Sequence, residues 1–308
     1  NTFESRKKSR ELNEKLIKLA LTSAAAISIL TTFGILFSIL FEAIEFFKLR
    51  SFWYFITGAT WSPGVIGSQF GALPIFAGTF VITIIALGVA IPVGLGSAIY
   101  MSEYASANIR DYLKPLLEIL AGIPTVVYGF FAAITVAPLV VQIAEFFGLE
   151  ATFNSALASG VVMGIMIIPV ISSLSDDVIR AVPDSQRKAA FALGMTHGET
   201  IKNIVLPSAM PGIISASLLG LSKALGETMI VVMAAGLRPN LSWNPLEDMT
   251  TVTVTIVNSL VGDFEFNSPE TLSAFALGLI LFVVTLILNM ISLSLIIKFK
   301  EKYKVNTL

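Results

Sequence analysis

The sequence contains no cysteine and only one histidine, His197. The absence of cysteine excludes a disulfide framework and a thiolate metal site, and His197 has no second candidate ligand beside it, so neither a metal nor another cofactor is expected. One histidine also supports little acid–base chemistry. The Gly-x-Ser-x-Gly elbow and the His-Glu-x-x-His pair are both missing, so the sequence does not indicate an enzyme.

The dipeptide Gly-Lys is absent too, and with it the Gly-x-x-x-x-Gly-Lys-Ser/Thr loop that cradles the phosphates of ATP. The chain is therefore not expected to hydrolyse ATP by that mechanism. Charged residues are also scarce: they make up 13% of the 308 residues, whereas 55% are hydrophobic. This composition leaves too little polar surface to cover a soluble globule, so we expect an integral membrane protein that is surrounded by membrane lipid. The net charge of −1 gives no reason to expect nucleic acid as a partner.

Long apolar runs predict an all-α, polytopic membrane protein with six transmembrane helices. No internal repeat is evident, so we expect one membrane domain from residue 19 to 297, between a basic tail at 1–18 and a second basic tail at 298–308. A signal peptide has a similar beginning, but the first run is too long and no small-x-small cleavage site follows, which favours a retained span. The predicted spans are residues 19–41, 72–101, 115–141, 155–174, 209–236 and 272–297.

Two stretches between the spans are expected on the external side. Residues 42–71 are mixed in character and place Trp53, Tyr54 and Trp61 among polar residues, as is typical of a segment that lies at the membrane interface. Residues 237–270 are expected to form a polar loop.

The basic residues indicate the orientation. Most of the 20 Lys and Arg residues lie in the two tails, in the turn after the second span and around residues 183–207. The opposite side has Lys48, Arg50 and Arg238. Because basic loops stay in the cytoplasm, we expect both termini and the 183–207 segment on the cytoplasmic side of the plasma membrane.

The polar segment at residues 183–211 is predicted to contain two short helices. Asp184 or Ser185 is expected to cap the first, and Gly194 to end it in left-handed geometry. Thr196 and Glu199 have the spacing of a capping box for a second helix that runs to Pro207. An ordinary loop with helical turns is the alternative on spacing alone. Water-facing helices between membrane spans nevertheless indicate contact with something in the water.

Lys223 and Glu227 are two charges in the predicted fifth span. Each charge at the centre of a membrane helix costs roughly 2.5 to 3.5 kcal/mol, so both are expected to face protein or a water-filled path. Four residues apart, they would share one helix face. We interpret them, with the adjacent Thr228, as lining a substrate path; an internal ion pair is the alternative. Lys223 would attract an anion, and Glu227 would accept a proton from it, which favours hydrogen phosphate over sulfate.

A second candidate lies in the third span, at Gly122-Ile123-Pro124-Thr125. Pro124 frees a backbone carbonyl, and Thr125 is expected either to satisfy that carbonyl or to face a bound ligand, as in the broken helices of transport sites.

The segment around Gly194 resembles the signature loop of ABC importer permeases, Glu-Ala-Ala, three residues, Gly, nine residues, Ile-x-Leu-Pro. Both spacings are kept, although Lys188 stands where the family usually has Glu. The resemblance implies that this segment is a coupling helix docked on an ATP-hydrolysing subunit. The residues to which it assigns this role are Lys188, Ala189, Ala190, Gly194, Thr196, Glu199, Ile204, Leu206 and Pro207.

Further motifs resemble those of PstC-type permease subunits of phosphate importers, among them Gly78-Thr79, Ser102-Glu103-Tyr104, residues 121–129 and residues 224–229. The resemblance implies the type I ABC importer permease fold and phosphate transport by alternating access. It also implies a sister permease (PstA-like) in a heterodimer, two copies of an ATP-binding subunit (PstB-like) and an external phosphate-binding protein (PstS-like). Lys223 stands where this family often has Arg, so a bidentate grip on phosphate by that residue is not expected.

Three alternatives stay open from the sequence. In the first, the protein is such a permease, but its substrate is another oxyanion, sulfate or molybdate. The second is a secondary transporter driven by an ion gradient, against which the lack of a repeat speaks. The third is a membrane scaffold without a transport role.

Overall fold

The structure is a computed structural model that describes the backbone of residues 2–64, 67–261, 265 and 267–302, and the side chains of these from residue 13 to 299. It is almost entirely helical, as predicted, with a two-stranded antiparallel hairpin in which Trp61 lies opposite Phe70. The elements are α1 (Thr2–Leu49), α2 (Phe52–Thr57), β1 (Trp61–Ser62), β2 (Gln69–Phe70), α3 (Leu73–Ile99), α4 (Ala107–Ala121), α5 (Thr125–Phe131), α6 (Ala137–Phe146), α7 (Ala156–Arg180), α8 (Asp184–Ala192), α9 (His197–Thr200), α10 (Leu206–Leu225), α11 (Met229–Ala234), α12 (Val252–Val261) and α13 (Pro269–Lys302), with π-helical turns η1 (Tyr100–Tyr104), η2 (Ala132–Val136) and η3 (Ile201–Val205).

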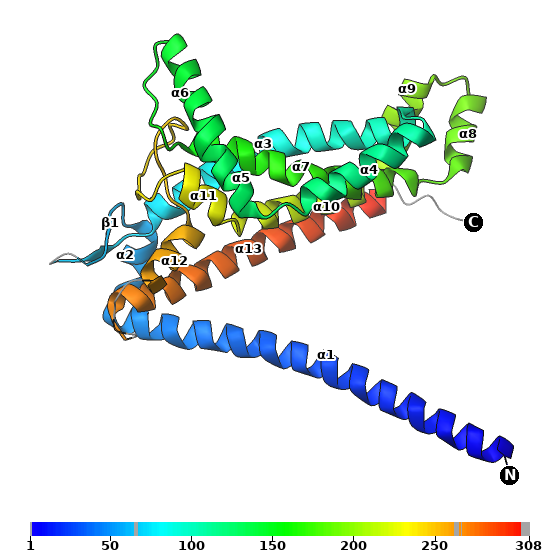
Figure 1. Ribbon diagram of the computed structural model, residues 1–308, viewed down its shortest axis with the longest axis horizontal. Helices are drawn as coiled ribbons and strands as arrows, with labels where there is room; N and C mark the ends of the chain where they lie inside the picture. The colour runs from blue at the N-terminus through cyan, green and yellow to red at the C-terminus, as the bar shows by residue number, and fades with distance from the viewer. Residues whose placement is uncertain (1, 65–66, 262–264, 266, 303–308) are drawn as a thin grey trace.

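The helices form an elongated bundle (Figure 1). The hairpin, α2, α11 and α12 lie at one end, which we call the hairpin end, and α8 and α9 lie at the other, which we call the elbow end. Within the described residues, six helices are long and apolar enough to cross a membrane, which is the number predicted. They span Asn13–Leu49, Leu73–Tyr104, Thr125–Phe146, Ala156–Arg180, His197–Leu225 and Pro269–Phe299.

The centre of the bundle is the packing of α3 along α7, with α10 beside both. Two glycines of α7 allow this close approach. A Cβ atom on Gly160 would lie 2.7 Å from Ile85, and one on Gly164 would lie 2.8 Å from the carbonyl oxygen of Ala86. Small residues are the usual contact surface of membrane helices, because no hydrophobic effect drives apolar helices together within lipid.

A second cluster, at the hairpin end, is aromatic. The ring of Phe46 meets those of Phe55 and Phe70 edge to face, with centroids 5.2 and 5.5 Å apart. The ring of Trp61 is perpendicular to that of Phe70. The prediction that residues 42–71 lie at the surface holds for most of the described residues and is wrong for the buried aromatic ones, Phe46, Phe55, Trp61 and Phe70. Helix α1 continues to Leu49, and Trp61 is buried, whereas Trp53 is 74% exposed.

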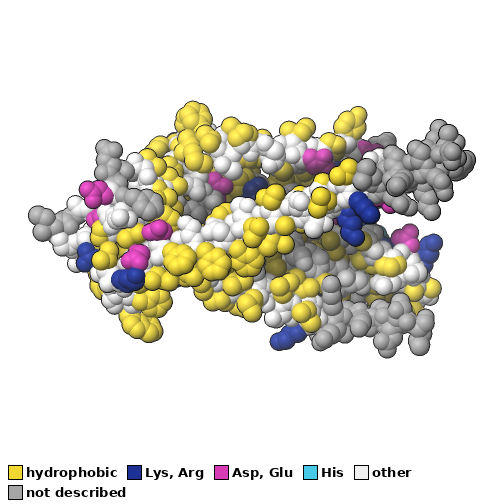
Figure 2. Space-filling model, turned by 90° about the horizontal axis from the view of Figure 1, so that it is seen from below, with side chains coloured by type: hydrophobic (Ala, Val, Ile, Leu, Met, Phe, Trp, Pro, Cys, Tyr) yellow, Lys and Arg dark blue, Asp and Glu magenta, His cyan; other side chains and the backbone are white. Residues whose placement is uncertain are grey.

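Helix α1 departs from the bundle along most of its length (Figure 1) and packs on α13 near the hairpin end. Its apolar side chains from Leu16 to Phe41 are largely exposed. On the face seen in Figure 2, hydrophobic side chains cover most of the middle, and most charged side chains lie near the two ends. Such an apolar belt is what lipid requires of the surface of a spanning protein.

Several predicted boundaries differ from the structure. The third span is interrupted: α4 begins at Ala107, and the chain breaks at 122–124 before α5. The fourth helix extends to Arg180 and includes Asp176. Pro207 does not end a helix, because it occupies the first turn of α10, where a missing N–H is tolerated. The loop at 237–270 contains α12.

The basic tails were predicted as separate segments. The first is the beginning of α1 in the structure. For seven basic residues of the two tails the structure does not describe the side chains: Arg6, Lys7, Lys8, Arg10, Lys300, Lys302 and Lys304.

Candidate functional site

The fifth predicted span is broken next to its charged residues. Helix α10 ends at Leu225, and α11 begins at Met229. In the gap, the carboxylate oxygen Oε1 of Glu227 accepts hydrogen bonds from the backbone N–H of Met229 at 3.0 Å and of Ile230 at 3.2 Å. A carboxylate is favourable here because the first N–H groups of a helix lack partners within it and carry partial positive charge.

This geometry corrects the predicted arrangement of Lys223 and Glu227. Lys223 lies in the last turn of α10, so the two residues do not share the face of one continuous helix. No ion pair joins them in the described part of the chain, so the alternative of an internal pair is also wrong. Glu227 is 7% exposed, and its second oxygen, Oε2, accepts no hydrogen bond from a described residue. Lys223 and Thr228 are half-buried.

Helix α12 contributes a residue that the sequence analysis missed. The hydroxyl of Thr253 donates a hydrogen bond of 2.8 Å to the backbone oxygen of Glu227, and it lies 3.1 Å from the hydroxyl of Thr251. The run Thr-Thr-Val-Thr-Val-Thr-Ile from residue 250 was interpreted as part of a polar loop. The hydroxyl of Thr255 bonds to the carbonyl of Thr251 one turn earlier, and Val252 and Val254 are fully buried, so the run forms a buried helix despite its threonines.

The break predicted at residues 122–125 is also present, and the helix that follows it, α5, packs against α11. The chain leaves helical geometry before Thr125, and the freed carbonyl of Leu120 accepts a hydrogen bond of 2.9 Å from the hydroxyl of Tyr128. Thr125 is half-buried and makes no hydrogen bond through its hydroxyl to a described residue, so the expectation that it satisfies a carbonyl is wrong. One turn later, a Cβ atom on Gly129 would lie 3.1 Å from the backbone oxygen of Met229, which places α5 directly against α11.

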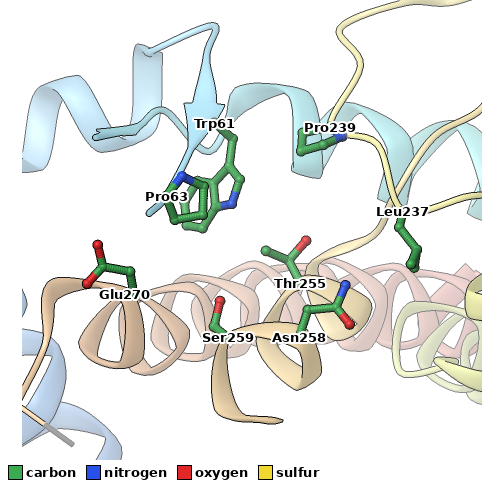
Figure 3. A pocket seen from close by; sticks show the side chains of 8 residues that line it. All are labelled: Trp61, Pro63, Leu237, Pro239, Thr255, Asn258, Ser259 and Glu270. Carbon is green, nitrogen blue, oxygen red and sulfur yellow. The ribbon is translucent and has the colours of Figure 1, made fainter. Parts of the chain in front are cut away.

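A cavity of about 230 Å³ lies beyond α12, at the hairpin end (Figure 3). Trp61 and Pro63 of the hairpin and Leu237 and Pro239 of the following loop face one side of it. Thr255, Asn258 and Ser259 of α12 and Glu270 at the start of α13 face the other. Helix α12 therefore extends between this cavity and the break at Glu227.

The elbow end has the predicted local geometry. Gly194 has φ +80° after α8, and the N–H of Met195 bonds to the carbonyl of Ala190, which closes the turn. Thr196 and Glu199 form the predicted capping box: each side chain accepts a hydrogen bond from the other residue's backbone N–H. The predicted cap of α8 is wrong, because Pro183 holds the N-cap position without a side-chain hydrogen bond.

The residues to which the family resemblance assigns coupling are divided between surface and interior. Ala190 of α8 is buried, with 3% of its surface exposed. The half-buried members lie in η3 and α10, and the other five are exposed. The half-buried ones are Ile204, Leu206 and Pro207, and the exposed ones are Lys188, Ala189, Gly194, Thr196 and Glu199.

Arg187 fastens α8 to the bundle, and the sequence analysis did not single it out. Its guanidinium bonds to the carboxylate of Glu103 at 2.8 Å, to the carbonyl of Ile179 at 3.0 Å and to the carbonyl of Val182. It thereby caps the C-terminus of α7, where a cation is favourable. His197 makes a further contact, with a ring nitrogen 3.2 Å from the carbonyl of Glu103.

A second ionic contact joins α4 to α7. Arg110 donates a hydrogen bond of 2.8 Å to Asp176, whose side chain is fully buried, and Lys114 pairs with Asp177. The sequence analysis placed Asp176 just beyond the fourth span, and nothing local identifies a partner 66 residues away.

The apolar belt, the interrupted helices that meet inside the bundle and the helical elbow define a polytopic membrane permease. The chain belongs to the family described as binding-protein-dependent transport system inner membrane component, which matches residues 90–298.

Two relatives extend the similarity beyond the family region. A Bacillus subtilis protein described as "Probable ABC transporter permease protein YqgH" is 32% identical over 91% of this chain and 90% of its own length. The "Phosphate transport system permease protein PstC" of Mesorhizobium japonicum is 34% identical over 87% of this chain and 86% of its own.

Solved structures show the same fold. A chain of the MetNI methionine ABC transporter, in an inward-facing conformation, matches 74% of this chain and 94% of its own with a TM-score of 0.54 and 16% identity. A chain of a bacterial ABC transporter involved in the import of alginate matches 86% of this chain and 96% of its own with a TM-score of 0.55 and 14% identity. At these identities the likeness concerns the fold alone, and it confirms the predicted ABC importer permease fold.

Proposed function

We propose that this protein is the permease subunit of an ATP-driven importer of inorganic phosphate in the plasma membrane. The observation that carries the proposal is the break between α10 and α11. There a nearly buried carboxylate is held by two backbone N–H groups, and a lysine lies four residues before it, in the last turn of α10. The names of the relatives, PstC among them, support phosphate as the substrate.

The chemistry of the break suits an oxyanion that carries a proton. Because the two N–H groups occupy Oε1 of Glu227, the other oxygen is available to accept a hydrogen bond from a P–OH group. Lys223 supplies a positive charge for the remaining phosphate oxygens. Sulfate has no proton to donate at neutral pH, so the negative charge of Glu227 would repel it.

The mechanism is alternating access. Broken helices are a usual feature of transport sites, because backbone that leaves helical geometry inside a membrane is tolerated where it lines a cavity or is buried in protein. An external phosphate-binding protein (PstS-like) delivers phosphate at the hairpin end. Thr228 lies at the start of α11 and Thr125 at the start of α5, and these two helices pack against each other. Both threonines line the path with Lys223 and Glu227.

The energy comes from outside the chain. The elbow end faces the cytoplasm with both termini, and α8 docks on one of the two copies of an ATP-binding subunit (PstB-like) through the exposed coupling residues. A sister permease (PstA-like) completes the transport path. The chain itself is not catalytic.

The test is uptake of labelled phosphate by cells that depend on this system, with the complete set of subunits and measured permease abundance. Glu227→Gln keeps the shape of the side chain and removes its charge. We expect at least about a tenfold loss of phosphate uptake, because a hydrogen bond to a charged group contributes about 1.5 to 3 kcal/mol. The control is Glu145→Gln on the exposed face of α6, which should transport normally.

Two results would contradict the proposal. Normal phosphate uptake by Glu227→Gln would remove Glu227 from the path, and system-dependent uptake of sulfate or molybdate without phosphate would establish the rival oxyanion. Collapse of the proton gradient without ATP depletion distinguishes the gradient-driven alternative from the ATP-driven importer, because phosphate uptake would then stop only in a gradient-driven transporter.

A further inference from the structure

Thr79 lies in α3, far from Glu227 in the sequence, in a Gly78-Thr79 pair to which no role has so far been given. It is 3% exposed. Its hydroxyl donates a hydrogen bond of 2.8 Å to the carbonyl of Ile75 and accepts one of 3.0 Å from the backbone N–H of Val252. Val252 is the first residue of α12, and the first N–H groups of a helix have no partner within it. Thr79 therefore supplies the acceptor that the start of α12 needs.

Gly78 makes this contact possible. A Cβ atom at this position would lie 2.2 Å from the backbone oxygen of Thr250 and 3.3 Å from the Cβ of Met249. Both of those residues are fully or almost fully buried, so neither has room to move aside. The pair is thus a seat on α3 for the beginning of α12.

The seat connects to the break through one peptide unit. Val252 is bonded to Thr79, and the next residue, Thr253, donates its hydroxyl to the backbone oxygen of Glu227 at 2.8 Å. These two hydrogen bonds fix the start of α12 on one side to α3 and on the other to the gap between α10 and α11. A shift of α12 on its seat would move the donor that holds Glu227.

We propose that Thr79 is a positioning residue for the Glu227 site: it holds α12 so that Thr253 fixes the backbone from which Glu227 projects. The inference rests on the proposed function, because it assigns the same site a supporting residue. Thr79 itself need not touch phosphate. Its role is to keep the carboxylate in place during the transport cycle.

The experiment uses the assembled transporter with its binding protein, reconstituted in liposomes, and measures phosphate moved per ATP hydrolysed. Thr79→Val keeps the shape and removes the hydroxyl. We expect the ratio to fall about tenfold, since a small misplacement of a site group has effects of this size or larger. Thr79→Ser should restore it, because serine retains the hydroxyl. Thr83→Val, a buried threonine one turn further along α3, is the matched control and should leave the ratio unchanged.

A double-mutant cycle tests the route. If Thr79 acts through α12, Thr253→Val should also lower the ratio, and Thr79→Val together with Thr253→Val should be little worse than the stronger single variant. Thr253 is only half-buried, so this variant remains informative if Thr79→Val assembles poorly.

The outcomes separate the two proposals. An unchanged ratio in Thr79→Val or in Thr253→Val, or losses that multiply in the double variant, would overturn the inference while Glu227→Gln remains impaired. A normal ratio in Glu227→Gln would instead overturn the proposed function. A Thr79→Val protein that loses abundance or thermal stability but keeps its ratio has a structural role only, which also overturns the inference.

Discussion

The two ends of the bundle are held together by different forces. At the hairpin end, Phe46, Phe55 and Phe70 form an aromatic cluster, and close packing of backbone accompanies it. At the elbow end, an apolar cluster that includes Ile179, Val182 and Val205 is supplemented by ionic contacts between elements, with Arg187 on Glu103 and Arg110 on Asp176. Apolar packing of the first kind is lost as soon as the elements move apart. The second is directional and can exchange partners, including water and the side chains of another subunit.

The difference indicates which end moves. Packed apolar interiors do not deform gradually, so the hairpin end suits a fixed frame for the site. Ionic and hydrogen-bonded contacts between α8, η1 and α7 suit the end on which a motor subunit acts. The following predictions test this division, since stability should depend more on the hairpin end and coupling more on the elbow end.

The largest loss of stability is expected from Phe46→Ala. Phe46 is fully buried among aromatic rings, and removal of a buried phenylalanine side chain costs about 3 to 5 kcal/mol. The thermal midpoint of the detergent-solubilised complex should fall, while the phosphate moved per ATP by the surviving protein stays normal. Phe37→Ala, on the exposed face of the same helix, is the control. A reduced ratio at normal stability would contradict the division.

Arg187→Met should show the opposite pattern. The variant removes the cap of α7 and leaves the Glu103 side chain, 6% exposed, without its cation, a loss of about 1.5 to 3 kcal/mol. We expect ATP hydrolysis that is no longer matched by phosphate uptake in the reconstituted transporter. Lys202→Met, at an exposed lysine of η3, should remain coupled. Normal coupling in Arg187→Met would show that α8 does not transmit force through this contact.

Gly194→Ala should have a smaller effect. Gly194 has φ +80°, a left-handed conformation that costs an alanine about 1 to 2 kcal/mol. The turn after α8 would relax, and coupling should fall in part. Gly198→Ala serves as the comparison, because Gly198 lies within α9 with no atom near its Cβ position, where alanine is favourable. Equal effects of the two variants would mean that the left-handed turn is unimportant.

The smallest effect concerns Glu247, in the segment at the hairpin end that leads to α12. Hydrogen bonds from Asn240, Ser242 and Asn244 lower the pKa of Glu247. A carboxyl with a lowered pKa in the folded state stabilises the fold at neutral pH, and this contribution disappears as the pH falls through that pKa. Glu247→Gln should therefore lower the thermal midpoint slightly at neutral pH and not in acid. A difference that persists in acid would show that the charge is irrelevant.

Local patterns in the sequence predicted local geometry well. The capping box of Thr196 and Glu199 and the left-handed turn at Gly194 depend on residues a few positions apart, and both are present. Apolar runs likewise predicted the number of spans. The positions where spans end were less well predicted, because Leu206 and Pro207 continue a helix that the sequence analysis had ended there.

The sequence indicated Lys223 and Glu227 as candidate site residues, but it did not predict how they lie relative to each other. Lys223 and Glu227 stand out as charges in an apolar run, yet their helical spacing wrongly implied one face of one helix. The chain breaks at Gly226, and the carboxylate finds its partners on the next helix. Thr253 and Arg187 were missed, because a threonine in a mixed segment and an arginine in a polar one carry no signal of their distant partners.

The sequence alone determined that the chain spans the membrane, how many helices do so and where a polar helical elbow interrupts them. These properties follow from transfer free energies and from hydrogen bonds between near neighbours, both of which are local. Only the tertiary structure decided that α12 packs on Gly78 and Thr79, that it fixes Glu227, and that Asp176 pairs with Arg110. Such contacts join residues far apart in the chain, and their partners are selected by the packing of whole helices.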